Sequence, residues 1–412
     1  MTIKKIIAIV FIFMMTAIAW MILGGANSVR TKTLSNSLKT QVANLYGGKL
    51  NIESPKCFSR ITKHKEETVN NTIRIVEYFE NNYHELINSD IKIDVYLDQR
   101  KKGNMWFPTF KAEFKGEYIF QIDESSKDDL FIYSTLNSSD AIYNNLYLKI
   151  NNEDIDNVLP LINKQEIPVI PLSDNTVKLM VSYSATGMED LYYLITTERN
   201  AIAQINNFKL VLSTDFDLYD FPSNMMSPTT INKTDNRNEL IWELNKTITG
   251  KNIGLLIPNK LNPGEIITRV SFFAPVSLLF FFIVLLMFTV VLKVKIHPMH
   301  YFFLAATFFS FHLMFSYFSD QLDIYLSFAI SAVISLFLTI TYMRFFAPKR
   351  IAFIYAPAIQ FIYLIIFSFS FFFDGITGMI VTICAVITLF ILMQVTGKIN
   401  WEEEFTRKST DI

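Results

Sequence analysis

Hydrophobic residues gather into long runs near the two ends of the chain, with a long polar insert between them. One run covers Lys5–Leu23, and five more follow one another between Val270 and Thr396. Each run has the ~20 residues that an α-helix needs to cross the hydrocarbon of a bilayer. We therefore expect six transmembrane helices in a 1+5 arrangement, with the insert forming a domain between helix one and helix two.

Short hydrophobic runs within the insert alternate with polar residues, and this period of two is typical of β-strands. The runs are Ile91–Leu97, Lys111–Ile122, Leu130–Leu136, Leu146–Ile150, Val177–Tyr183, Leu191–Thr197, Phe208–Ser213, Leu240–Leu244 and Ile253–Ile257. Strands of this spacing predict an antiparallel sandwich or an open barrel. Pro168 and Pro171 predict an edge strand or a turn, and Ser184–Gly187 predicts a hairpin turn. The fold class is therefore mixed, with a helical bundle and a large, mainly-β domain.

Two other segments have helical spacing. Apolar residues recur every three or four positions in Ser28–Leu45, so we expect the first membrane helix to continue outward as an amphipathic stalk. The same spacing in Lys65–Ser89, with Glu66 and Glu67 in the first turn, predicts one amphipathic helix against the β domain. Its apolar positions are Val69, Ile73, Val76, Phe79, Tyr83 and Leu86.

The basic residues of the short segments outside the insert lie on one side of the predicted membrane if the N-terminus is cytoplasmic. They are Lys4, Lys5, Lys293, Lys295, Arg344, Lys349, Arg350, Lys398, Arg407 and Lys408. The short turns on the other side, Ser319–Asp323 and Asp374–Gly375, contain no Lys or Arg, as the positive-inside rule requires. The predicted order is an anchor (1–23), an exported domain (24–269), a five-helix bundle (270–396) and a cytoplasmic tail (397–412). The first run is longer than the 7–15 apolar residues of a cleavable signal peptide, the alternative for this segment, which favours an uncleaved anchor.

Composition and charge narrow the function classes. The chain is 51% hydrophobic with a net charge of −1, and the insert alone has a net charge of about −4. This balance argues against a nucleic-acid partner. The two cysteines, Cys57 and Cys384, fall in the insert and in the last hydrophobic run, so no intrachain disulfide is expected.

Sequence motifs of enzymes are missing from the chain. We find no Gly-x-Ser-x-Gly, no phosphate loop, no zinc-ligand spacing and no nucleotide fingerprint. The sequence therefore predicts a protein without catalytic residues, cofactor or metal. A hydrolase built on two carboxylates stays open, because such a site leaves little local signature.

Ionisable residues at membrane depth are costly and mark functional candidates. His312 is the candidate inside the third run. Asp320, Asp323 and Asp374 lie at the outer helix ends, where they form either an acidic mouth or solvated ends. His297-Pro298 predicts a sharp helix start, since proline suits a first helical turn; metal binding with His300 is the alternative.

Several motifs resemble the CreD-type inner-membrane proteins of bacteria. They are Ile296-His297-Pro298-Met299-His300-Tyr301, Phe318-Ser319-Asp320, Thr396-Gly397-Lys398-Ile399-Asn400-Trp401, the entry segment Pro263 to Arg269, and Phe208–Pro222 followed by Trp242. Thr289 departs from the family, which usually has an acidic residue there. The resemblance implies an anchor, a periplasmic β-rich domain and five C-terminal helices in the bacterial inner membrane, and a role in envelope stress.

The expected function is support of cell-envelope integrity by a periplasmic binding or scaffold domain. The lipid bilayer is the expected partner, together with an envelope protein or a cell-wall ligand. A transporter or lipid-handling protein is the alternative, and a periplasmic hydrolase is the third hypothesis.

Overall fold

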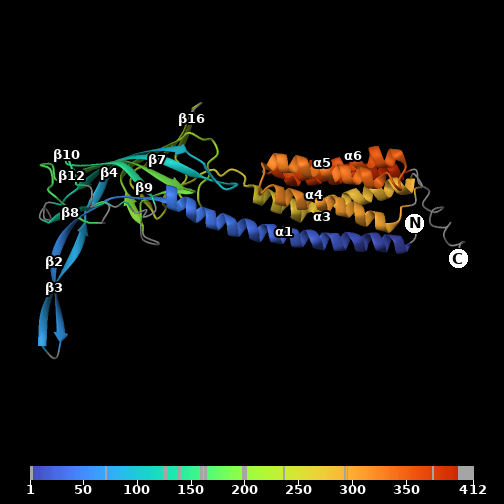
Figure 1. Ribbon diagram of the computed structural model, residues 1–412. Coiled ribbons are helices and arrows are strands. Elements are labelled where there is room, and N and C mark those ends of the chain that lie inside the picture. Colours follow the sequence, from blue (N-terminus) through green and yellow to red (C-terminus); the bar gives the residue numbers. More distant parts are fainter. Residues whose placement is uncertain are drawn as a thin grey trace. The chain divides into compact units, whose positions relative to one another are not determined.

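Two compact units make up the structure, a computed structural model (Figure 1). Ser37–Lys260 form a β unit, and Met1–Asn36 together with Leu261–Ile412 form a helical unit. The structure describes residues 3–69, 72–123, 129–134, 136, 141–157, 161, 165–196, 202–234, 237–291, 294, 296–373 and 375–397.

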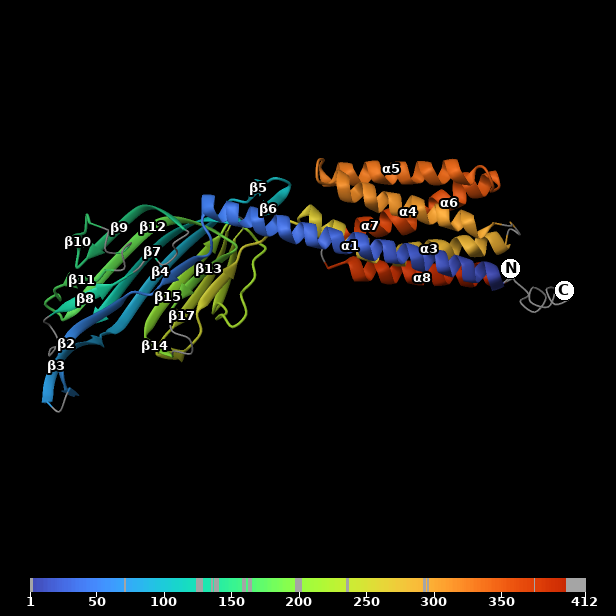
Figure 2. The same cartoon turned by 60° about the horizontal axis from the view of Figure 1, so that its bottom comes forward.

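Among the described residues, six helical stretches are long and apolar enough to cross a membrane, in the expected 1+5 order along the chain. The long regular helices are α1 (Ile3–Tyr46), α3 (Pro263–Val291), α4 (Pro298–Phe318), α5 (Ile324–Met343) and α8 (Thr377–Thr396). Within the helical unit, α3, α4, α5 and α8 lie side by side (Figure 2). Because α1 continues to Tyr46, the predicted helical continuation after the first hydrophobic run is confirmed.

The remaining stretch, Ile351–Phe372, is irregular. It consists of the π-helical turn η2 (Ile351–Tyr355), α6 (Ala356–Gln360), the π-helical turn η3 (Phe361–Ile366), α7 (Phe367–Phe369) and the 3-10 turn η4 (Ser370–Phe372). Pro357, the second residue of α6, follows directly on the wide turn η2 and has no N–H to donate to that turn. The helix therefore stays continuous but contains two wide turns.

An eight-stranded sheet dominates the β unit, in the order β10-β9-β12-β7-β4-β15-β17-β16 (Figure 2). These strands are β4 (Glu85–Leu97), β7 (Thr109–Gln121), β9 (Ile142–Ile150), β10 (Glu153–Asp154), β12 (Thr176–Met188), β15 (Asn207–Thr214), β16 (Thr230–Thr234) and β17 (Arg237–Leu244). Smaller sheets contain β1 (Leu50–Glu53), β2 (Lys56–Val69), β3 (Thr72–Tyr83), β5 (Arg100–Lys102), β6 (Met105–Phe107), β8 (Leu130–Tyr133), β11 (Ile167–Val169), β13 (Asp190–Leu194), β14 (Ala203–Ile205), β18 (Thr247–Thr249) and β19 (Ile253–Leu256). Each of the nine strands expected from the sequence is present.

One face of the large sheet is the core of the β unit. Along β7 the side chains alternate, so that Phe110 and Phe114 are buried while Lys111 and Glu113 are exposed. A three-stranded sheet, β1-β13-β19, contributes to the same core. The expected antiparallel arrangement is wrong in part, because β15 runs parallel to β4 and β1 runs parallel to β13. Long connections join both parallel pairs, and strand periodicity alone does not specify them.

The amphipathic helix predicted for Lys65–Ser89 is wrong. This segment covers the end of β2, the whole of β3 and the start of β4, and β2 and β3 form a hairpin that extends from the rest of the unit (Figure 1). Residues 73, 75, 79 and 83 are also apolar at a spacing of two and four, and β-branched and aromatic residues favour strands. A pairing ladder between β2 and β3 therefore overrides the helical spacing.

The hairpin turn predicted at Ser184–Gly187 is also wrong, because these residues lie inside β12. The chain turns one residue after β12, at Glu189, whose φ is 71°. Gly187 is needed for close packing: a Cβ there would lie 2.6 Å from the Phe110 ring. The predicted edge is confirmed, since β11 with Pro168 is the outer strand of the sheet β11-β8-β2-β3.

Candidate functional site

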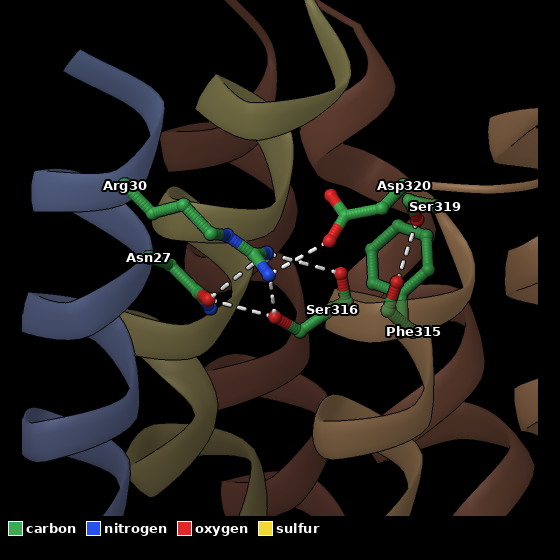
Figure 3. A network of polar contacts seen from close by, with 6 residues as sticks. All are labelled: Asn27, Arg30, Phe315, Ser316, Ser319 and Asp320. Carbon is green, nitrogen blue, oxygen red and sulfur yellow. Dashed lines mark hydrogen bonds and ion pairs between the residues drawn. The ribbon is translucent and has the colours of Figure 1, made fainter. Parts of the chain in front are cut away.

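A polar network joins α1 to α4 in the helical unit (Figure 3). Arg30 of α1 donates to Asp320 Oδ2 at 2.8 Å and to the Ser316 carbonyl at 3.2 Å. The two charged side chains are 37% and 44% exposed, so their ion pair is partly screened by solvent. Arg30 also lies over the Tyr317 ring, 5.4 Å from its centroid. Sequence reasoning missed Arg30, because its partner is 290 residues away.

Asn27 is the buried centre of this network. Its side chain is 3% exposed, and its Oδ1 accepts from Ser316 Oγ at 2.7 Å. Its Nδ2 donates to Ser271 Oγ at 3.3 Å, which adds α3 to the network. Polar side chains between membrane helices bond most readily to one another. The network therefore fastens the first helix to two helices from the other end of the chain.

The acids proposed for a mouth have separate roles. Asp320 pairs with Arg30. Asp323 is the N-cap of α5, where its Oδ1 accepts from the backbone N–H of Tyr325 at 2.9 Å. Asp374 lies outside the described residues. Among the described acids, the geometry thus shows one ion pair and one helix cap.

His312 lies inside the bundle, 1% exposed. Its Nδ1 is 2.9 Å from the Phe308 carbonyl, and because a carbonyl only accepts, Nδ1 is the donor in this hydrogen bond. The Trp20 ring meets the imidazole edge-on at 5.3 Å between centroids. Trp20 itself is fully buried by protein.

The His-Pro motif begins α4. His297 is its N-cap and accepts from Met299 N–H at 3.3 Å, and Pro298 occupies the first turn. His300 bonds Tyr342 at 2.8 Å and stacks on Phe346 at 3.7 Å between ring centroids. In the described part of the chain no three His, Cys, Asp or Glu residues could hold a metal ion together. The motif therefore starts and orients a helix in this geometry.

Four other motif residues belong to α4, to its C-terminal end or to α3. Tyr301 is buried against Phe282, and Ser319 ends α4 with its hydroxyl on the Phe315 carbonyl at 2.6 Å. Arg269 is an exposed residue of α3. Met299 is 51% exposed.

Three further positions of the family motifs, Trp242, Thr289 and Trp401, lie in other parts of the chain. Trp242, in β17, is fully buried and donates to the Met226 carbonyl at 3.0 Å. Trp401 and the Thr289 side chain lie outside the described residues.

The bundle contains a second set of polar contacts. Thr307 and Thr339 share a hydrogen bond of 2.9 Å between α4 and α5, and Ser335 donates to the Thr307 carbonyl at 2.7 Å. Gln360 of α6 donates to Ser335 at 2.8 Å. Three helices are thus linked by hydroxyl and amide groups.

The β unit holds a cavity of about 620 Å³. His84, between β3 and β4, is at its wall and is 8% exposed. Neither ring nitrogen of His84 has a hydrogen-bond partner among the described residues. Burial lowers the pKa of His84 despite the nearby Asp123 carboxylate, so the ring is neutral at pH 7.

Cys57 also lines the cavity, and its side chain is 1% exposed. Burial raises the pKa of its thiol to about 12, which suppresses the nucleophilic thiolate. Cys57 and Cys384 are both free thiols.

Comparison with known proteins supports the resemblance found in the sequence. Residues 243–402 match the family model described as inner membrane protein CreD. A search of curated proteins found no match. The family resemblance is therefore confirmed over the helices that follow the β unit.

Proposed function

We propose that this chain, which over residues 243–402 is of the CreD family of inner membrane proteins, supports cell-envelope integrity through its β-rich domain. In this proposal the helical unit anchors the domain in the bacterial inner membrane, and the domain binds or shields an envelope component. The protein acts without enzymatic chemistry or a cofactor. The observation that carries the proposal is the network of Arg30, Asn27, Ser316 and Asp320.

This network supports an anchor because its polar groups bond to other helices of the same unit. A relay for ions or protons instead needs groups that line a continuous path. Arg30 and Asp320 neutralise each other, and Asp323 is held by the backbone of α5. Both acids are thus committed to helix packing.

Orientation belongs to the same proposal. The distribution of Lys and Arg supports an orientation with both termini in the cytoplasm and residues 24–269 in the periplasm. Alkaline phosphatase fused after Asn206 should be active, and the same enzyme fused after Lys398 should be inactive. The opposite pattern contradicts the orientation.

A charge exchange tests the scaffold. Arg30→Asp alone sets two carboxylates against each other and should reduce tolerance of envelope-directed antibiotics in a deletion strain. Arg30→Asp combined with Asp320→Arg restores an ion pair and should restore tolerance at equal protein abundance. Asp323→Asn, which keeps a good N-cap, is the matched control and should behave as the parent. Failure of the exchanged pair at normal abundance overturns the scaffold proposal.

Transport or lipid handling is the second candidate, favoured by buried polar atoms in the bundle. His312 Nε2, Gln360 Oε1 and Ser368 Oγ have no hydrogen-bond partner among the described residues. Unpaired groups of this kind are costly and mark functional positions. His312→Phe keeps an aromatic ring against Trp20. Loss of tolerance in this variant at normal abundance favours transport.

A further inference from the structure

A groove of about 360 Å³ lies on the surface of the helical unit between α4 and α5. Phe303, Ala306 and Thr307 line it from α4, and Leu338 and Tyr342 line it from α5. Phe345, two residues after α5 ends, also lines it. The walls are mainly aromatic and aliphatic, and the small Ala306 leaves room between larger side chains. Such a surface suits a hydrocarbon chain.

Positive charge collects where α5 ends. Arg344 is the C-cap of α5, and its guanidinium lies over the Phe345 ring, 4.9 Å from the centroid. Because Phe345 lines the groove, Arg344 is next to it. Lys349 and Arg350 follow within six residues, and all three cations are exposed.

The three cations have no ion pair with any described residue. The sequence from Ile324 to Phe373 contains no Asp or Glu at all. A helix C-terminus has a partial charge of about −0.5, which three full positive charges exceed. The chain segment that follows α5 therefore carries a net positive charge.

We propose that this groove binds an anionic phospholipid, with one acyl chain between α4 and α5 and the phosphate headgroup at Arg344, Lys349 and Arg350. Basic pockets between membrane helices recognise such headgroups, and each cation near an anionic surface adds to the attraction. A free phosphate lacks the chain that fills the apolar groove. The site is independent of the proposed periplasmic function and of the orientation of the chain.

Native mass spectrometry of the full chain in a neutral detergent tests the site. The probes are dioleoyl phosphatidylglycerol and dioleoyl phosphatidylcholine, which share acyl chains and differ in net charge. The parent chain should bind phosphatidylglycerol at least tenfold more tightly than phosphatidylcholine. Arg344→Gln with Lys349→Gln and Arg350→Gln should abolish that preference. Lys4→Gln with Lys5→Gln removes cations elsewhere and should leave it unchanged.

A second set of variants tests the groove itself. Ala306→Phe fills it without changing charge and should weaken phosphatidylglycerol binding tenfold or more. Thr341→Trp, on the opposite wall, should do the same and covers the case in which Ala306→Phe does not fold. Glycerol phosphate at millimolar concentration should not compete. The proposal is overturned if the parent binds both lipids equally, or if the preference for phosphatidylglycerol survives the triple substitution. It is also overturned if Ala306→Phe and Thr341→Trp both bind phosphatidylglycerol as tightly as the parent.

Discussion

Removing the amide of Asn27 should lower the free energy of unfolding of the helical unit more than removing the charge of Asp320. Asn27 is 3% exposed and bonds Ser316 at 2.7 Å and Ser271 at 3.3 Å. Interhelical hydrogen bonds in membranes contribute about 0.6 kcal/mol each on average. We therefore expect Asn27→Leu, which keeps the branched shape of the side chain without its hydrogen-bonding groups, to lower the free energy of unfolding by about 1–2 kcal/mol.

The ion pair contributes less, although its charges are full. At 2.8 Å the Coulomb energy of Arg30 and Asp320 is about 1.5 kcal/mol in water. Their side chains are 37% and 44% exposed, so screening and side-chain entropy reduce the net value. A double-mutant cycle with Arg30→Met and Asp320→Asn should give a coupling of about 0.5–1 kcal/mol.

Unfolding of the full chain by SDS in mixed micelles, followed by far-ultraviolet circular dichroism, measures these changes. Asp323→Asn is the matched control, because Asn caps a helix about as well as Asp and its effect should be near zero. A loss for Asp323→Asn equal to that for Asn27→Leu refutes the reasoning. So does a coupling of zero between Arg30 and Asp320.

Three further predictions concern the β unit. Burial raises the pKa of Cys57 to about 12, so in a Cys384→Ser background this thiol should resist iodoacetamide at pH 8 and react fully in urea. In the unfolded chain the thiol ionises near its ordinary pKa of 9.0. Cys57 therefore also makes the stability of the fold decrease above pH 9. Burial lowers the pKa of His84, so the folded state takes up the proton at a lower pH than the unfolded ring, whose pKa is 6.5. The melting temperature should therefore fall as the pH drops below 6.5, and His84→Phe should flatten that dependence. Trp242→Phe removes the hydrogen bond to the Met226 carbonyl and should cost about 1 kcal/mol in urea unfolding, whereas Trp242→Ala should cost about 3–5 kcal/mol; equal losses contradict the packing described.

Hydrophobic length and strand periodicity predicted most elements of this chain. Six apolar helices and the nine strands follow from local patterns, because burial on one side of each element fixes its period. Local patterns failed where two periods fitted the same residues. In β3, Phe79 and Tyr83 fit both the predicted helical stripe and one face of a strand, and the decisive fact is the ladder with β2.

The candidate site was less predictable for a related reason. His312 and Asp320 attract attention as ionisable residues in an apolar region, but the ring that packs on His312 and the cation that pairs with Asp320 both come from α1, in a distant part of the chain. Arg30 and Asn27 belong to a helix some 290 residues before Asp320, and a single sequence gives no sign of that contact. The parallel pairing of β15 with β4 also joins strands that are far apart in the sequence, so strand periodicity alone did not predict it.

The wide turns of the stretch Ile351–Phe372 affect how the protein can change in length. A π-helical turn such as η2 takes up one residue more than an α-helical turn, and the helix continues on either side of it. Deleting a single exposed residue there, such as Ile354, closes the turn to regular helix and leaves Gln360 facing Ser335. A deletion at Val333 in the regular helix α5 instead rotates every later side chain of that helix by about 100°. Single-residue deletions should therefore be tolerated at η2 and rejected in α5, so the long apolar helices of this chain differ in which of them can be shortened.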